Sequence, residues 1–306
     1  MRGVADPENY DEFGLFHENA EEYGVPWKGP PTVRRESVPV AHDGRRVSAL
    51  VWGRDDPELV LLHGGGQNAH TWDTVALALD RALVAIDLPC HGHSDYRETG
   101  PFDPRQNAAD VAVVIRALAP DARMVVGMSL GGLTNIALCT HAPELVRKAV
   151  LVDVTPGVDN EKGSAIGQFL AGPESFESFD EILSRTIEYN PTRTESSLRR
   201  GVLHNALRRP DGRWVWRHQQ VRPPDLDQRR REIDFKDLWP DVSLIAVPVM
   251  LLRGMAQGSV IDDANEAEFL RRQPNARVEH VEGAGHSLQG DQPVETARLL
   301  ADFLDS

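Results

Sequence analysis

Runs of apolar β-formers alternate with longer amphipathic runs from about residue 46 to the end of the chain, and this pattern constrains the fold most. The runs that predict strands cover residues 46–53, 58–66, 82–89, 122–129, 148–155, 247–254 and 276–283. Their nearly continuous apolar character is typical of strands covered on both faces. The runs with helical spacing cover residues 68–80, 105–119, 131–146, 262–273 and 292–306. This alternation predicts βαβ crossovers and an α/β fold with a mostly parallel, doubly wound sheet.

The alternation is interrupted between residues 156 and 240. This segment contains helical fragments and an aromatic stretch, and its basic and acidic residues are equal in number, whereas the whole chain has a net charge of −14. We interpret 156–240 as a helical cap inserted into a core of residues 31–155 and 241–306. Residues 1–30 are interpreted as an acidic N-terminal arm or short helix. Within the core, residues 32–40 are expected to pair with 46–53 across the turn signal Asp43-Gly44.

Charge and composition exclude several classes of partner. The strongly acidic balance argues against a broad surface for nucleic acid or anionic membranes. No apolar run of the sequence approaches the length of a membrane span, and the first residues lack the apolar core of a secretory signal. The only cysteines, Cys90 and Cys139, are expected to be reduced thiols in a cytoplasmic protein. The sequence leaves the oligomeric state open.

One serine stands between glycines directly after a predicted strand, in the stretch VVGMSLGG. A tight turn from strand to helix needs small neighbours, which Gly127, Gly131 and Gly132 supply around Ser129. Such a turn exposes the hydroxyl above the sheet and directs the free N–H groups of the following helix toward it. We therefore predict that Ser129 is a nucleophile rather than a structural serine of a glycine-rich turn.

A nucleophilic serine also needs donors for the developing oxyanion. The segment His63-Gly64-Gly65-Gly66 follows an earlier strand and offers a backbone without obstructing side chains. The predicted donors are the N–H groups of Gly65 and Leu130. His63 itself is interpreted as a structural residue that hydrogen-bonds the loop.

These motifs resemble those of the α/β-hydrolase family over about residues 40–306. The resemblance rests on the HGGG loop, the GHSD segment after the next strand, the serine turn and a late histidine, in the family's order. It implies that His286, which lies between the last predicted strand and the last helix, is the catalytic base. It also implies a hydrolase acting on a small molecule, with no metal or organic cofactor.

The acid that orients the histidine departs from the family's usual position. The loop after the strand at 247–254 has Gln257 near the expected site, and Asp262 and Asp263 follow, where they read as helix-capping residues. Some relatives, including haloalkane dehalogenases and certain lactonases, carry the acid at the end of the strand that follows the nucleophile helix. Asp153 has that position here and is the preferred acid, with Asp262 or Asp263 as the alternatives.

Two motifs offer competing chemistry. His91 to Asp95, HGHSD, resembles the His-x-His-x-Asp zinc motif of metallo-β-lactamase-type hydrolases, although Tyr96 follows where that motif has another histidine. Cys90 is a second candidate nucleophile, but no strand–turn–helix motif surrounds it. Both alternatives are less favoured than the serine mechanism.

The predicted reaction is hydrolysis of a small or medium carboxylic ester or lactone through an acyl-enzyme. Thioester or carbon–carbon hydrolysis uses the same residues, and a non-catalytic ligand receptor on this fold is the alternative from another class. Trp214, Trp216 and Trp239 are interpreted as packing the cap onto the core rather than as a substrate pocket. Arg229-Arg230-Arg231 is interpreted as a solvated surface, and the sequence assigns no substrate-binding residue.

Overall fold

The computed structural model describes residues 10–41, 44–100, 102–158, 167–169, 172–190, 193–219 and 233–306. Its strands are β1 (Val33–Pro39), β2 (Arg46–Trp52), β3 (Leu59–Leu62), β4 (Leu83–Ile86), β5 (Met124–Met128), β6 (Ala149–Val152), β7 (Ala206–Arg208), β8 (Trp214–Trp216), β9 (Val249–Gly254) and β10 (Arg277–Val281). Its α-helices are α1 (Phe16–Tyr23), α2 (Asp73–Leu79), α3 (Pro104–Leu118), α4 (Leu130–His141), α6 (Phe179–Tyr189), α7 (Glu195–Asn205), α9 (Trp239–Leu244), α10 (Asp263–Arg272), α11 (Leu288–Asp291) and α12 (Pro293–Asp305). Short 3-10 helices are η2 (Ala69–Trp72), η3 (Pro143–Leu145), η4 (Arg217–Gln219) and η5 (Phe235–Leu238).

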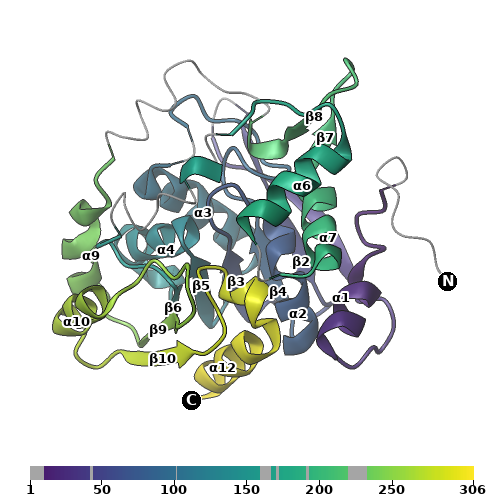
Figure 1. Cartoon of the computed structure of the whole chain (residues 1–306). Coiled ribbons are helices and arrows are strands. Elements are labelled where there is room, and N and C mark those ends of the chain that lie inside the picture. The colour runs from purple at the N-terminus through teal and green to yellow at the C-terminus, as the bar shows by residue number, and fades with distance from the viewer. Residues whose placement is uncertain are drawn as a thin grey trace.

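A single eight-stranded sheet runs through the core in the order β1-β2-β4-β3-β5-β6-β9-β10 (Figure 1). Strand β2 is antiparallel to β1 and to β4, and the pairs from β4 to β10 are parallel. The predicted hairpin is confirmed, because Pro39 pairs with Arg46 at its closed end. The predicted doubly wound sheet is confirmed as well.

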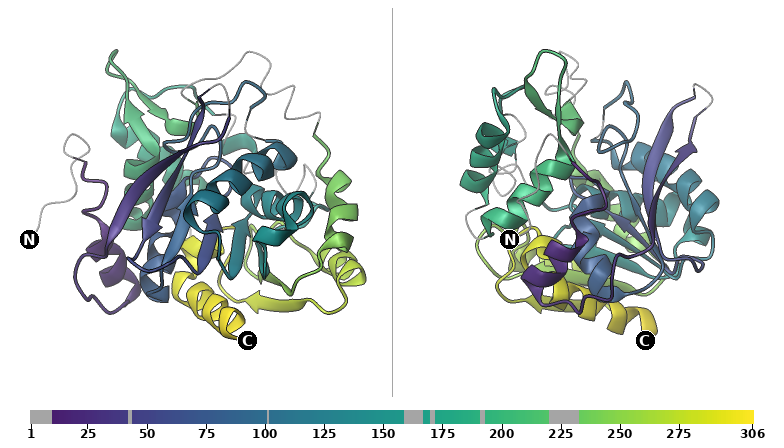
Figure 2. Two further views of the ribbon diagram at one scale, coloured as in Figure 1. Left: turned by 180° about the vertical axis from the view of Figure 1, so that it is seen from behind. Right: turned by 90° about the vertical axis from the view of Figure 1, so that its right-hand side faces the viewer.

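Helices cover both faces of this sheet, as Figure 2 shows from two further sides. On one face, α3, α4 and α9 pack over the apolar side chains of the strands, and on the other face α2, α11 and α12 do so. The central strands β3, β4, β5 and β6 are buried along their whole length. Their continuous apolar sequence thus reflects burial on both faces.

The described residues between β6 and η5 form a separate group that includes α6, α7 and the hairpin β7–β8 (Figures 1 and 2). Phe176, Phe179, Ile182 and Trp216 belong to an apolar cluster of its own. The helical fragments predicted here are confirmed, and β7–β8 is an addition that the sequence pattern did not indicate. The division of the chain into arm, core and cap stays a prediction.

The described part of the N-terminal segment packs against both the core and the inserted segment. Phe16 of α1 is buried in the apolar cluster under the sheet, whereas Leu15 is buried in the cluster of α6 and α7. Arg200 of α7 donates to Asn19 at 2.8 Å and pairs with Glu22. Residues 10–24 therefore connect the core to the inserted segment. No helix of the described residues is both long and apolar enough to span a bilayer.

Candidate active site

Ser129 occupies a strained turn between β5 and α4. Its backbone has φ 51° and ψ −118°, a positive φ that residues with side chains rarely adopt. Its N–H donates to the carbonyl of Val152 at 3.3 Å, which holds the turn against the end of β6. Strained backbone of this kind is concentrated at functional sites, where the surrounding structure enforces it.

Close packing around this turn explains the neighbouring glycines. A Cβ atom on Gly127 would lie 2.2 Å from the carbonyl oxygen of Gly131, and a Cβ on Gly131 would lie 2.4 Å from that of Leu62. Helix α4 therefore begins in direct backbone contact with β5 and β3. Any larger side chain at these positions would push the helix away and displace Ser129.

The glycine loop after β3 passes beside the serine. A Cβ on Gly64 would lie 3.3 Å from Cβ of Ser129. His63 fixes this loop: its Nδ1–H donates to the carbonyl of Gly64 at 2.7 Å, and its Nε2 accepts from the N–H of Leu88 at 2.9 Å. Burial lowers the pKa of His63, so the ring is neutral at pH 7. The structural role predicted for His63 agrees with these contacts.

The two predicted oxyanion donors belong to the glycine loop and to α4. Gly65 follows Gly64 in the glycine loop, and Leu130 is the first residue of α4. A backbone N–H in the first turn has no acceptor within its own helix, and it lies at the positive end of the helix dipole. Their assignment as donors stays a prediction.

Asp153 lies at the end of β6 and is completely buried. Oδ1 accepts hydrogen bonds from the N–H of Gly254 at 3.0 Å and the hydroxyl of Ser259 at 2.6 Å. Oδ2 accepts from the N–H of Val260 at 3.0 Å and from Nδ1 of His286 at 2.9 Å. Four donors therefore satisfy both oxygens of this buried side chain.

His286 follows β10 on the loop that leads to α11, and its side chain is 13% exposed. A Cβ on Gly254 would lie 2.2 Å from the carbonyl oxygen of Gly285, so this loop is packed directly against the end of β9. With Nδ1–H bonded to Asp153, the lone pair of the neutral ring is on Nε2. The ring thus has the tautomer that a general base for serine requires.

The alternative acids have other roles. Asp262 caps α10 in a reciprocal pair of hydrogen bonds with Asn265. The side chain of Asp263 is 97% exposed and pairs with Arg253. The loop that usually carries the acid supplies Ser259 and Val260 as donors to Asp153 instead. Sequence reasoning missed these donors; the serine near the family's usual acid position is the signal that could have indicated them.

The residues of the two competing motifs, the zinc-type motif and Cys90, have structural surroundings in their loop. His91 uses both ring nitrogens: Nε2 accepts from the N–H of Gly66 at 2.9 Å, and Nδ1 donates to the carbonyl of Pro89 at 3.0 Å. Asp95 accepts from the N–H of Arg46 at 2.8 Å. The thiol of Cys90 is buried, and burial raises its pKa, which disfavours the nucleophilic thiolate. These contacts count against both a zinc motif and a cysteine nucleophile.

A cavity of about 170 Å³ lies between η2, α7 and α11. Ser129 and His286 are not among the residues that line it. Gln67 and Gln289 both line it, and Nε2 of Gln289 donates to Oε1 of Gln67 at 3.4 Å. Trp216 contributes an apolar part of the lining.

The predicted tryptophans have different surroundings. Trp214 and Trp216 share one face because β8 is extended, and they contact the cluster of the inserted segment. Trp239 packs against the core, where the guanidinium of Arg272 lies 5.0 Å from its ring centre. Only Trp239 therefore meets the expected packing against the core. Arg229, Arg230 and Arg231 lie outside the described residues.

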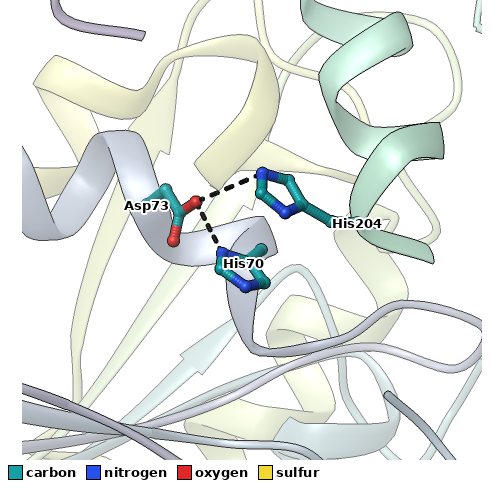
Figure 3. A group of neighbouring side chains, drawn as sticks. All are labelled: His70, Asp73 and His204. Atoms are coloured by element: carbon teal, nitrogen blue, oxygen red, sulfur yellow. Dashed lines mark hydrogen bonds and ion pairs between the residues drawn. The ribbon is translucent and has the colours of Figure 1, made fainter. Parts of the chain in front are cut away.

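One group of side chains in the described part of the chain has the composition of a metal site: His70, Asp73 and His204 (Figure 3). Burial alone would lower the pKa of His70, but the charges and hydrogen bonds of Asp73 and Glu12 raise it to about 9. Burial lowers the pKa of His204 well below its ordinary value. At pH 7 the pair therefore consists of one charged ring and one neutral ring.

Comparison with known proteins gives consistent results. A family profile described as "Alpha/beta hydrolase family" matches residues 59–299. Esterase Rv0045c of Mycobacterium tuberculosis is 44% identical over 304 residues, covering 97% of this chain and 96% of that protein. Its crystal structure has a TM-score of 0.84 and covers 97% of this chain and 99% of that one. The 2-(acetamidomethylene)succinate hydrolase of Mesorhizobium japonicum is 27% identical, covering 82% of this chain and 88% of that protein.

Proposed function

The chain belongs to the α/β-hydrolase family, and on this premise we propose that it hydrolyses carboxylic esters with Ser129, His286 and Asp153 as its catalytic residues. The observation that carries the proposal is the 2.9 Å bond between His286 Nδ1 and Asp153 Oδ2, at the same edge of the sheet as the strained turn of Ser129. The likeness to an esterase over nearly the whole chain supports the ester as substrate class.

In the proposed mechanism, Nε2 of His286 removes the proton of the Ser129 hydroxyl as the oxygen attacks the ester carbonyl. The buried charge of Asp153 stabilises the imidazolium that forms and keeps its Nδ1–H in place. The N–H groups of Gly65 and Leu130 stabilise the oxyanion; each donor of this kind contributes about 10²–10³ in rate.

Collapse of the tetrahedral intermediate expels the alcohol, which takes the proton from Nε2 of His286. A water molecule, activated by the same nitrogen, then attacks the acyl-enzyme and releases the acid. We further propose that residues 156–240 act as a cap whose contacts restrict the substrate. The cavity lined by Gln67 and Gln289 supports this proposal, because residues of α6 and α7 form part of its wall.

The test is turnover of p-nitrophenyl esters from acetate to octanoate by the wild type and by Ser129→Ala. We expect turnover to be lost in the variant while the circular dichroism spectrum is unchanged. Ser243→Ala, which alters an exposed serine on α9, is the matched control and should keep wild-type rates. A Ser129→Ala variant with near wild-type turnover would refute the serine mechanism.

Covalent labelling tests whether Ser129 is a nucleophile independently of which substrate the protein hydrolyses. A fluorophosphonate probe should modify Ser129 in the wild type, as identified by peptide mass spectrometry. Labelling without turnover of any ester in the series would keep the nucleophile and exclude simple esters as substrates. Absence of both labelling and turnover would favour a non-catalytic ligand-binding protein.

A further inference from the structure

Three buried side chains with metal-ligating atoms meet where the inserted segment touches the core. His70 is the second residue of η2, Asp73 begins α2, and His204 lies in the last turn of α7. One ligand atom of each lies within 4.8 Å of the other two. In Figure 3, one carboxylate oxygen of Asp73 faces a nitrogen of each imidazole. Residues that are 131 positions apart in the sequence, Asp73 and His204, thus form one polar group.

The two imidazole rings are stacked, which brings their nitrogen edges to the same carboxylate. The ring centres of His70 and His204 are 3.8 Å apart with an angle of 10° between the planes. Nδ1 of His70 lies 2.9 Å from Oδ2 of Asp73, and Nε2 of His204 lies 3.7 Å from the same oxygen. Because the lone pairs of stacked rings are nearly parallel, a small cation that contacts all three atoms would require at least one ring to tilt out of the stack.

Two atoms of this group are buried without a hydrogen bond. Oδ1 of Asp73 and Nε2 of His204 have no hydrogen-bond partner, and the two side chains are only 3% and 4% exposed. A buried polar atom without a partner costs about 1–3 kcal/mol. Both atoms are electron-pair donors when His204 is neutral and carries its proton on Nδ1, toward Tyr10, so a cation would satisfy them together.

The outer nitrogens of both rings are held by the N-terminal segment. Nε2 of His70 is 3.1 Å from a carboxylate oxygen of Glu12, and Nδ1 of His204 is 2.6 Å from the hydroxyl of Tyr10. Histidine ligands of metals commonly donate their second N–H to a carboxylate or another oxygen, which fixes the ring and its tautomer. The same arrangement here directs Nδ1 of His70 and Nε2 of His204 toward Asp73.

We propose that His70 Nδ1, His204 Nε2 and the Asp73 carboxylate bind one divalent transition-metal ion of the Zn²⁺ type. Binding breaks the hydrogen bond between His70 and Asp73 and releases its proton to solvent, while three metal–ligand bonds form. Two imidazoles and one carboxylate favour Zn²⁺ or Co²⁺ over Mg²⁺ and Ca²⁺, which prefer oxygen ligands. The fourth position faces the cavity, because all three residues line it. The ion would link the core to α7 and is not part of the proposed ester chemistry.

The test uses the full chain, dialysed against EDTA and then titrated with Co²⁺. We expect one Co²⁺ per chain, with the intense visible absorption of a tetrahedral site, and displacement by Zn²⁺. Zn²⁺ should also raise the melting temperature of the wild type, because it binds the folded state only. His204→Asn should weaken binding at least about 100-fold, and Tyr10→Phe, which alters only the outer contact, about 10–100-fold.

His280→Asn is the matched control, since this exposed histidine on β10 also pairs with a carboxylate, Glu266. It should bind Co²⁺ like the wild type. Weak, octahedral-type absorption in the wild type, or equal binding by His204→Asn, would overturn the proposal. If His204→Asn does not fold, Tyr10→Phe decides: unchanged affinity there would overturn it. Ser129→Ala should retain the ion, so failure of this proposal is distinguishable from failure of the serine mechanism.

Discussion

Replacing Asp153 by asparagine tests the relay between acid and histidine most directly. The carboxylate accepts two hydrogen bonds on each oxygen, and two of its four donors are the fixed backbone N–H groups of Gly254 and Val260. An amide NH₂ group placed on either side therefore opposes one backbone N–H. One unsatisfied buried donor costs about 1–3 kcal/mol, which is the expected loss in the free energy of unfolding.

The loss of activity should be larger than the loss of stability. If the amide NH₂ faces His286, Nδ1 must become the acceptor and Nε2 carries the proton, so the ring cannot act as a base. If the amide oxygen faces His286, the tautomer is kept but the charge that stabilises the imidazolium is gone. We expect kcat to fall about 10³–10⁴-fold. KM should change little, because Asp153 is completely buried and cannot touch the substrate.

The assay is steady-state hydrolysis of the best p-nitrophenyl ester, together with urea unfolding at the same pH. Asp262→Asn is the control: asparagine caps helices as well as aspartate, so activity and stability should stay near the wild type. A kcat for Asp153→Asn within tenfold of the wild type, or a greater loss in Asp262→Asn, would refute the assignment of the acid.

Four further outcomes are expected. Ser259→Ala removes one charge-assisted hydrogen bond to Asp153, which is worth about 1.5 kcal/mol. We therefore expect kcat to fall roughly tenfold while the protein still folds, and an unchanged kcat would contradict this. Gly127→Ala should destabilise the protein by about 1–3 kcal/mol in urea unfolding, since its Cβ would overlap α4, and an equal midpoint would contradict the packing. Burial lowers the pKa of His63, His91 and His204, so these three groups make the unfolded chain bind more protons below about pH 6.5. His70, whose pKa is raised to about 9, acts in the opposite direction. Since three groups oppose one, the free energy of unfolding should decrease as pH falls from 7 to 5.5; constant or rising stability would contradict this. EDTA should leave the initial rate of ester hydrolysis unchanged, because every proposed step uses side chains, backbone N–H groups and water.

The local part of the fold and of the site was predictable from short stretches of sequence. Continuous apolar runs predict strands buried on both faces, and the strand–turn–helix at Ser129 follows from glycines that leave room for a tight backbone approach. His63 and Asp262 were also interpreted as structural residues from their immediate surroundings. Periodicity, turns and helix caps depend on neighbouring residues, and the sequence contains that information directly.

Contacts between distant segments were decided by tertiary packing. The convergence of Gly254, Ser259 and Val260 on Asp153 depends on how the loop after β9 folds over the end of β6. Residues 10–24 were interpreted as part of an acidic arm or short helix, yet they connect core and inserted segment through the partly buried ion pair of Arg200 with Glu22 and through apolar contacts. No local pattern relates His204 to His70, because their contact exists only once α7 packs on η2. The sequence by itself determined the layered fold and the nucleophile turn, whereas three-dimensional packing determined which carboxylate meets His286 and what fills the junction with the inserted segment.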